Sequence, residues 1–425
     1  MSELSDWKTF TVGNRFFLWH IPSSSILQVS KDLWQCARGQ ISPESLDKLQ
    51  NLSASLSKSY SCAQTPSIKI THIALNVAER CNLRCTYCYA GDGDYGNDSL
   101  MSLTTAQKAI RSFANPDYPL HISFFGGEAL LNFSLIQDVV NWCSEQKETF
   151  RYSLTSNGVL LNEKHLEFFK KHSFHLKVSY DGKSLQTTQR TQNPNLTRNL
   201  EDKLLKFEHA LHELRSFELR MTLSREGLSS TTQNILDTLT SYNYRVNYAR
   251  VSSQHPKHQF TQEDVQTLQT LLKQTVTHLL EKEDWDALMR LGNLKTLLRK
   301  FQEGEQGPFC GAGLNYLSVS TRGRFYLCHR FTEDEEECLG DLEHGLDPDK
   351  VARIVELRSA RKEPCSSCWM RKMCQGGCFH EHKMGRGRID SIDPIFCQLQ
   401  DTEMQIAFEV YLALKEREAR SPSPT

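Results

Sequence analysis

Six strand-like segments between residues 71 and 251 constrain the fold of this chain more than any other feature. They read THIALNV, LHISFF, RYSLTS, FHLKVSY, FELRMTL and YRVNYARV, and amphipathic segments with helical spacing separate most of them. Thr104 and Asn162 are the expected N-caps of two of these helical segments. Repeated strand and helix units predict a parallel sheet, and six strands suit an open or partial barrel.

The net charge and the lengths of the apolar runs exclude several classes of partner. A formal charge of -1 on 425 residues gives no electrostatic footprint for nucleic acid or for an anionic membrane. No apolar run approaches the roughly 20 residues needed to span a bilayer, and MSELSDWKTF lacks the regions of a secretory signal. We therefore expect a cytoplasmic protein. Disulfides are rare there, so 14 cysteines favour metal binding or redox chemistry.

Different patterns flank the predicted barrel. Residues 8–30 predict two strands around a turn from Pro22 to Ser25, DLWQCARG predicts a short helix, and NLSASLSKSYSCAQTPS predicts a polar linker. Residues 1–65 are thus expected to form a small separate module. Residues 262–302 predict helices, the chain beyond Gly307 is expected to be cysteine-rich and irregular, and EREARSPSPT is expected to be disordered.

Polar loops follow the first four predicted strands, where parallel sheets place their ligand sites. The first loop carries a cysteine cluster. The next three carry Gly126, Gly127 and Glu128, then Ser156, Asn157 and Gly158, then Ser179, Asp181 and Gly182. The sequence therefore predicts one site built from four loops.

The cysteine cluster consists of Cys81, Cys85 and Cys88, spaced as CxxxCxxC. A structural zinc site takes four ligands, and no fourth Cys or His lies close by in the sequence to complete one. Three thiolates on a cubane iron–sulfur cluster leave one iron open to a substrate or cofactor.

This spacing, with Tyr87 before the third cysteine, resembles the signature of the radical SAM enzymes. GGEALLN resembles their Gly-Gly-Glu motif, TSNGVLL and VSYDG resemble their third- and fourth-strand motifs, and Arg190 lies where related enzymes often have an arginine. The resemblance implies a [4Fe–4S] cluster on the three cysteines and S-adenosylmethionine on its open iron. One electron would split the sulfonium and give a 5′-deoxyadenosyl radical. The implied cofactor-binding residues are Tyr87, Gly126, Gly127, Glu128, Ser156, Asn157, Ser179, Asp181 and Arg190.

Seven further cysteines lie near the C-terminus: Cys310, Cys328, Cys365, Cys368, Cys374, Cys378 and Cys397. Taken alone, they indicate one or two metal sites, zinc among the options. Their spacing resembles the SPASM extension, which implies two auxiliary clusters, and so three iron–sulfur clusters in total. By this resemblance the outer cluster takes Cys365, Cys368, Cys374 and Cys397, and the inner one takes Cys310, Cys328 and Cys378. The inner cluster either keeps an open iron or gains Cys338 as a ligand.

The resemblance implies an α/β fold: a partial (β/α)6 TIM-like barrel with a small N-terminal module and a C-terminal cysteine-rich SPASM domain. The expected divisions are 1–65, possibly binding a leader peptide; 66–305, barrel and helical linker; 306–405, SPASM domain; and 406–425, a helical end and disordered tail.

SPASM enzymes mostly modify peptides, so the resemblance implies a peptide maturase. Its substrate would be a ribosomally made precursor peptide, its product an intramolecular thioether or carbon–carbon crosslink, and its electron source an external one-electron reductant. The alternatives are a sulfatase-type formylglycine maturase, a peptide epimerase and a non-catalytic metal-binding scaffold. Sulfatase maturases usually carry Asp after the second inner cysteine, where this chain has His329, a tentative catalytic base.

Overall fold

A computed structural model describes residues 3–58, 68–183, 185, 189–190, 194–303, 310–359 and 363–420. Its centre is an 11-stranded sheet in the order β10-β9-β8-β7-β6-β4-β11-β12-β13-β14, with β5 (Ser99–Leu100) paired to β4. The six predicted strands are β4 (His72–Glu79), β6 (Leu120–Gly126), β7 (Phe150–Ser156), β8 (His175–Ser179), β9 (Ser216–Leu223) and β10 (Arg245–Arg250). They pair in parallel throughout, which confirms the predicted α/β partial barrel.

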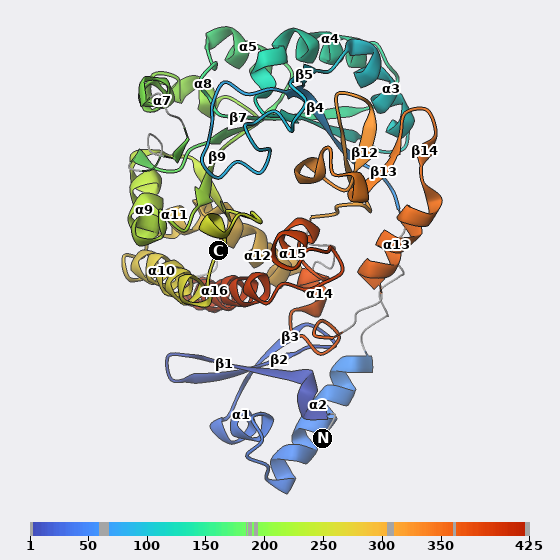
Figure 1. Cartoon of the computed structure of the whole chain (residues 1–425). Coiled ribbons are helices and arrows are strands. Elements are labelled where there is room, and N and C mark those ends of the chain that lie inside the picture. The colour runs from blue at the N-terminus through green and yellow to red at the C-terminus, as the bar shows by residue number, and fades with distance from the viewer. Residues whose placement is uncertain are drawn as a thin grey trace.

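Helices follow the strands and cover the outer face of the curved sheet (Figure 1). They are α3 (Leu103–Phe113), α4 (Phe133–Ser144), α5 (Glu163–Lys171), α7 (Pro194–Lys206), α8 (Glu208–His212) and α9 (Thr231–Ser241). Asn162 caps α5 as expected. Ser102, not Thr104, caps α3, because its hydroxyl accepts a hydrogen bond from the Thr105 N–H at 3.1 Å.

The C-terminal region extends the sheet, so the expectation of irregular structure there was wrong in part. β11 (Tyr316–Val319) pairs in parallel with β4, and β12 (Arg324–Tyr326), β13 (Cys338–Asp341) and β14 (Gly345–Leu346) continue antiparallel. All four residues of β11 are buried, and the pairing satisfies the backbone groups on the open side of β4. Three helices follow: α13 (Pro348–Ser359), α14 (Arg371–Cys374) and α15 (Phe379–Arg386).

A helical layer lies beside β10. It contains α10 (Gln262–Glu281), α11 (Trp285–Arg290) and α12 (Gly292–Glu303), as predicted, packed against α16 (Pro394–Arg420). A domain boundary was expected between residues 405 and 406, but α16 is continuous there, and Met404 and Phe408 on either side are buried. Residues 416–420, expected to be disordered, are its last turn. The expected divisions at 65 and 305, and residues 421–425, lie outside the described residues.

The N-terminal module has three strands, not the two that were predicted. β1 (Trp7–Val12), β2 (Arg15–His20) and β3 (Ser25–Val29) form an antiparallel sheet, because Gly13, with φ +56°, makes a tight turn inside the first predicted strand. α1 (Lys31–Ala37) and α2 (Pro43–Lys58) follow, and α2 occupies the first half of the predicted linker.

This module packs on the C-terminal region, next to α14 and α16 at one end of the molecule (Figure 1). The Phe10 ring stacks on Phe408 with centroids 4.1 Å apart and meets Trp369 edge-on at 5.3 Å. Trp19 meets Trp369 and Phe301 in the same way. The aromatic contacts place the module over the segment that carries the predicted outer cysteines.

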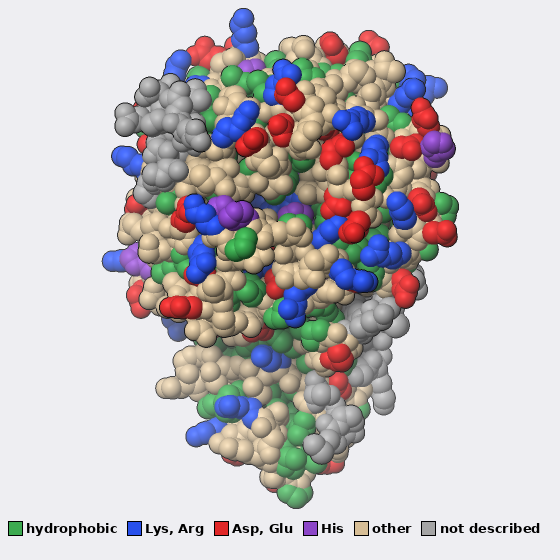
Figure 2. All heavy atoms as spheres, viewed as in Figure 1, with side chains coloured by type: hydrophobic (Ala, Val, Ile, Leu, Met, Phe, Trp, Pro, Cys, Tyr) green, Lys and Arg blue, Asp and Glu red, His purple; other side chains and the backbone are tan. Residues whose placement is uncertain are grey.

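The surface view shows Lys and Arg interspersed with Asp and Glu, as the near-zero net charge leads one to expect (Figure 2). Within the described ranges, no helix is both long and apolar enough to cross a lipid bilayer.

Candidate functional site

The loop after β4 brings Cys81, Cys85 and Cys88 together. Burial raises the pKa of Cys81 and Cys85 to about 11 and also raises that of Cys88, and each thiol further raises the pKa of another. A buried thiolate therefore needs a cation to stabilise it, and a metal supplies one.

The spacing of these thiols bears on which metal group fits. Among the described residues, no three Cys, His, Asp or Glu side chains gather closely enough to ligate one metal ion. A cubane spreads its thiolates over separate irons, so its ligands lie further apart than those of zinc. The three thiols lie near enough to one another to raise each other's pKa, as ligands of one shared metal group would.

Gly126 and Gly127 let the end of β6 lie directly against the cysteine loop. A Cβ on Gly127 would come within 2.0 Å of the Gly93 carbonyl oxygen and 2.5 Å of that of Arg80. Gly126 has φ +143°, and a Cβ there would lie 2.2 Å from the Ala78 oxygen. The Gly127 N–H donates to Ala78 at 2.8 Å, so backbone pairing fixes the two segments together.

Glu128 joins the second and third polar loops. Its buried carboxylate accepts hydrogen bonds from the Leu130 N–H at 3.0 Å, the Ser156 hydroxyl at 2.8 Å and the Asn157 N–H at 2.7 Å. Burial raises the pKa of Glu128, and these three donors oppose the rise. The Asn157 amide lies 3.8 Å from the Cys81 sulfur, which connects this group to the cysteines.

The fourth loop forms a separate buried network beneath Cys85. Asp181 accepts two hydrogen bonds from the Arg190 guanidinium, both at 2.9 Å, a third from the Thr222 N–H at 2.8 Å, and one from the Tyr87 hydroxyl. Asp181 is 1% exposed and Arg190 5% exposed. Burial raises the pKa of Cys85, and nearby Arg190 opposes that rise. Asp181 is therefore engaged within the protein and braces the cysteine loop.

Ser179 ends β8, and its backbone pairs in register with Arg220 of β9. Two inward-facing cations on these strands, Lys177 and Arg220, were missed by the sequence analysis. Each lies near the carboxylate of Glu218, at 3.8 and 3.9 Å. The alternation of charged and buried residues along β9 was the signal that could have found them.

Two of the seven C-terminal cysteines, Cys374 and Cys328, have different cysteine neighbours. Burial and the thiols of Cys397, Cys368 and Cys365 raise the pKa of Cys374 to about 12. Burial, then Cys378 and Cys310, raise that of Cys328. Cys338 pairs across two strands with Tyr326, and its thiol donates to the Gly340 carbonyl at 3.5 Å.

The His329 ring contacts residues of β6 and β11. Its Nδ1 is 2.6 Å from the Tyr316 hydroxyl, and its ring packs on Phe125 with centroids 4.1 Å apart. Burial and the cations of Arg330, Arg220 and Lys177 lower the pKa of His329 to about 3, so the imidazole is neutral. Arg330 pairs with Glu381 at 3.3 Å.

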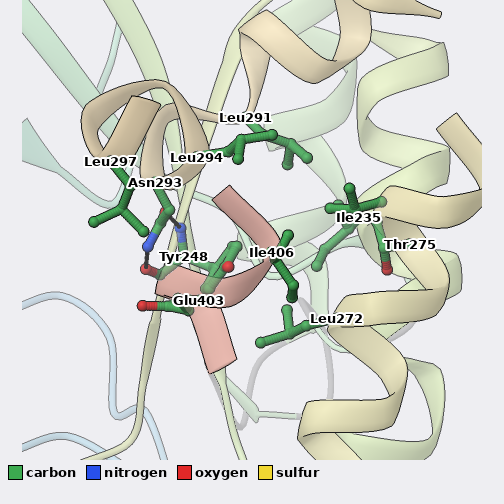
Figure 3. A pocket seen from close by; sticks show the side chains of 11 residues that line it. Ile235, Tyr248, Leu272, Thr275, Leu291, Asn293, Leu294, Leu297, Glu403 and Ile406 are labelled. Carbon is green, nitrogen blue, oxygen red and sulfur yellow. Dashed lines mark hydrogen bonds between the residues drawn. The ribbon is translucent and has the colours of Figure 1, made fainter. Parts of the chain in front are cut away.

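A separate cavity lies between β10 and the helices α9, α10, α12 and α16 (Figure 3). Its lining is mostly apolar, and Asn293 bonds the backbone of Tyr248 on both sides. Glu403 also lines this cavity, and burial raises the pKa of its carboxyl group to about 7. None of the predicted site residues lines this cavity, and we interpret it as part of the packing between sheet and helices.

Comparisons with known proteins agree with this architecture. Residues 75–198 match the Radical SAM superfamily. An uncharacterized protein of Methanocaldococcus jannaschii is 27% identical over 280 residues, 64% of this chain and 88% of that protein. The structure is similar to anSMEcpe with bound AdoMet, with a TM-score of 0.65 and 16% identity over 81% of this chain and 99% of that one. It is also similar to Streptococcus suis SuiB bound to the precursor peptide SuiA, with a TM-score of 0.55 and 14% identity over 92% and 98%.

The matched residues contain the CxxxCxxC loop, the glycine pair and Glu128, all at the carboxyl ends of parallel strands. A match to this superfamily implies S-adenosylmethionine and one [4Fe–4S] cluster. The sequence match thus identifies residues 75–198 as a radical SAM domain, and the similar folds agree with it.

Proposed function

We propose that this enzyme is a peptide maturase of the SPASM type that closes an intramolecular thioether or carbon–carbon crosslink in a ribosomally synthesised precursor peptide. The observation that carries the proposal is that Cys374 lies near Cys365, Cys368 and Cys397, whereas Cys328 lies near Cys310 and Cys378, all outside the radical SAM domain. Two structural neighbours support a peptide substrate, since anSMEcpe was solved with the Kp18Cys peptide and SuiB with SuiA.

In this proposal Cys81, Cys85 and Cys88 hold the radical SAM cluster, and Glu128 accepts the amino group of S-adenosylmethionine. An ionised carboxylate offers about four lone-pair sites, and internal donors use three of those of Glu128. One acceptor site therefore remains for an ammonium. When bound, the cluster and S-adenosylmethionine supply the removal of a hydrogen atom from the substrate.

The other proposed cofactor residues have different roles, which follow from the groups that each of them contacts. Gly126 and Gly127 contribute backbone, and Ser156 and Asn157 hold Glu128 in place. Asp181, Arg190 and Tyr87 keep Cys85 and its loop in position through a buried ion pair. Ser179 lies at the rim of the same mouth.

Cys365, Cys368, Cys374 and Cys397 would hold the outer auxiliary cluster, and Cys310, Cys328 and Cys378 the inner one. A crosslink removes two hydrogens from the peptide, so a second electron has to leave, and these clusters offer it a path. The position of Cys338, turned towards Gly340, supports an inner cluster with three cysteine ligands and an open iron.

His329 is the proposed proton acceptor of the reaction. In the tautomer in which Nδ1–H donates to Tyr316, Nε2 is left free to take a proton. Burial and the surrounding cations keep the imidazole neutral, but they also weaken it as a base, which counts against this role.

The N-terminal module is the proposed grip for the leader of the precursor. β3 is an edge strand of its sheet, so one side of its backbone can pair with an added strand. An external one-electron reductant completes the set of proposed partners.

The test is the intact mass and fragmentation of the peptide encoded beside this gene, after anaerobic co-expression with the enzyme or with a Cys85→Ala control. Loss of two hydrogens, a fragmentation-resistant segment and no aldehyde are expected. An aldehyde would show formylglycine formation instead, and deuterium incorporation in heavy water would show epimerisation. If the purified enzyme did not cleave S-adenosylmethionine under reductant, or contained zinc in place of about twelve irons, the proposal would be wrong.

A further inference from the structure

Arg358 is a buried arginine with no place in the reaction described above. It lies near the end of α13, and only 3% of its surface is exposed. Its Nη1 donates to the carbonyls of Gln375 at 3.2 Å and Gly377 at 2.9 Å, and its guanidinium stacks on the Phe379 ring at 3.8 Å. These contacts hold the loop between Cys374 and Cys378.

The rest of the guanidinium lacks a partner. Nε and Nη2 are buried and have no hydrogen-bond acceptor among the described residues. A buried charged donor left unpaired costs more than an unsatisfied neutral polar group. Bracing the loop requires only Nη1, so it does not account for a cation with two unused N–H groups.

The thiols around Arg358 identify the missing acceptor. Burial lowers the pKa of Arg358, whereas Cys310, Cys378, Cys374 and Cys328, in that order, raise it. Three of these four are the proposed inner ligands, and the fourth belongs to the outer group. Arg358 thus holds the loop that joins Cys374 of the proposed outer group to Cys378 of the proposed inner group. Cluster sulfurs accept N–H hydrogen bonds, and such bonds tune cluster potentials.

We propose that Arg358 donates Nε–H and Nη2–H to sulfur atoms of the inner auxiliary cluster and raises its reduction potential. This inference rests on the proposed function, because it requires the auxiliary clusters. Reduction adds one negative charge to the cluster, and a guanidinium in a site of low dielectric stabilises the charged product more than the reactant. Arg358 therefore helps the inner cluster to accept the electron that crosslinking releases.

The experiment uses the full chain with Cys81, Cys85 and Cys88 replaced by Ala, so that only auxiliary clusters remain, about eight irons. Reductive titration with dithionite, followed by electron paramagnetic resonance, gives the potential of each cluster. Arg358→Gln should make one cluster at least tenfold harder to reduce, which is about 59 mV for one electron. Arg353→Gln removes the same charge from the exposed side of α13 and should change neither potential.

A second readout starts from the unsubstituted protein and does not depend on Arg358→Gln. In this chain labelled with guanidino-15N arginine, pulsed spectroscopy of the reduced inner cluster should detect a nitrogen coupling. The coupling should disappear in Arg358→Lys and persist in Arg330→Lys, because Arg330 is committed to Glu381. Auxiliary iron at the expected level with no arginine coupling, or with an unchanged potential in Arg358→Gln, would overturn the inference alone. Absence of auxiliary iron from the chain would overturn both the inference and the proposed clusters.

Discussion

Gly127→Ala tests whether the glycine pair positions the cysteine loop. The new methyl group would meet the backbone oxygens of Gly93 and Arg80 at 2.0 and 2.5 Å, and backbone atoms cannot rotate away as a side chain does. Relief requires the loop to move and stretches the hydrogen bond from the Glu128 N–H to Arg80, now 2.9 Å. Overpacking costs about 1–3 kcal/mol and a lost hydrogen bond about 1 kcal/mol. We expect the free energy of unfolding to fall by about 3 kcal/mol.

The functional effect should exceed the loss of stability. A displaced loop misplaces three cluster ligands together, and errors near 1 Å reduce turnover roughly 100-fold. After anaerobic reconstitution, the variant should lose about four of about twelve irons and cleave S-adenosylmethionine at about 1% of the normal rate. The measurements are iron content, thermal unfolding and 5′-deoxyadenosine release.

Gly91→Ala is the matched control in the same loop. Gly91 has φ +64°, and a Cβ there meets nothing within 4 Å, so only backbone strain of about 1–2 kcal/mol applies. This control should keep its iron and its cleavage activity. Full iron and normal cleavage in Gly127→Ala would refute the reasoning, as would an equal loss in both variants.

Three further predictions concern other parts of the molecule. Asp181→Asn should destabilise the barrel by about 3–5 kcal/mol in chemical denaturation, because it leaves the Arg190 cation buried without its carboxylate; a change below 1 kcal/mol would contradict this. Burial, then nearby Lys and Arg, lower the pKa of His20 from 6.5 to about 4, so the folded state resists protonation and stability should fall as the pH drops from about 6.5 to about 4. Tryptophan fluorescence during thermal unfolding should show this slope, and His20→Phe should reduce it by the share of one histidine, because buried His121 and His329 contribute in the same direction. Cys338→Ala should retain all iron, whereas Cys310→Ala should lose inner-cluster iron; equal loss would make Cys338 a ligand.

Local sequence patterns predicted the barrel correctly where the residues of a single strand or helix are enough to specify its secondary structure. The six strands, the helices of residues 262–302 and the cap at Asn162 follow from hydrophobic period and capping chemistry. The errors arose at turns and ends. The turn at Gly13 divides one predicted strand into two, and α16 extends to Arg420 through residues that are polar in sequence. Buried residues such as Phe408 hold that helix in place, and sequence period alone does not reveal such a partner.

The sequence by itself determined which chemistry is available. Cysteine spacing, glycine pairs and acidic positions after strands are local features of the sequence. For example, one short loop brings Cys81, Cys85 and Cys88 together. Only the tertiary structure decided which groups serve each other across the chain. It turned Asp181 towards Arg190, directed the Cys338 thiol to the Gly340 carbonyl, and buried Arg358 with two nitrogens that have no acceptor in the described parts of the chain. Such partnerships depend on how sheet and helices pack, and residues far apart in sequence carry no local sign of the contact they will make.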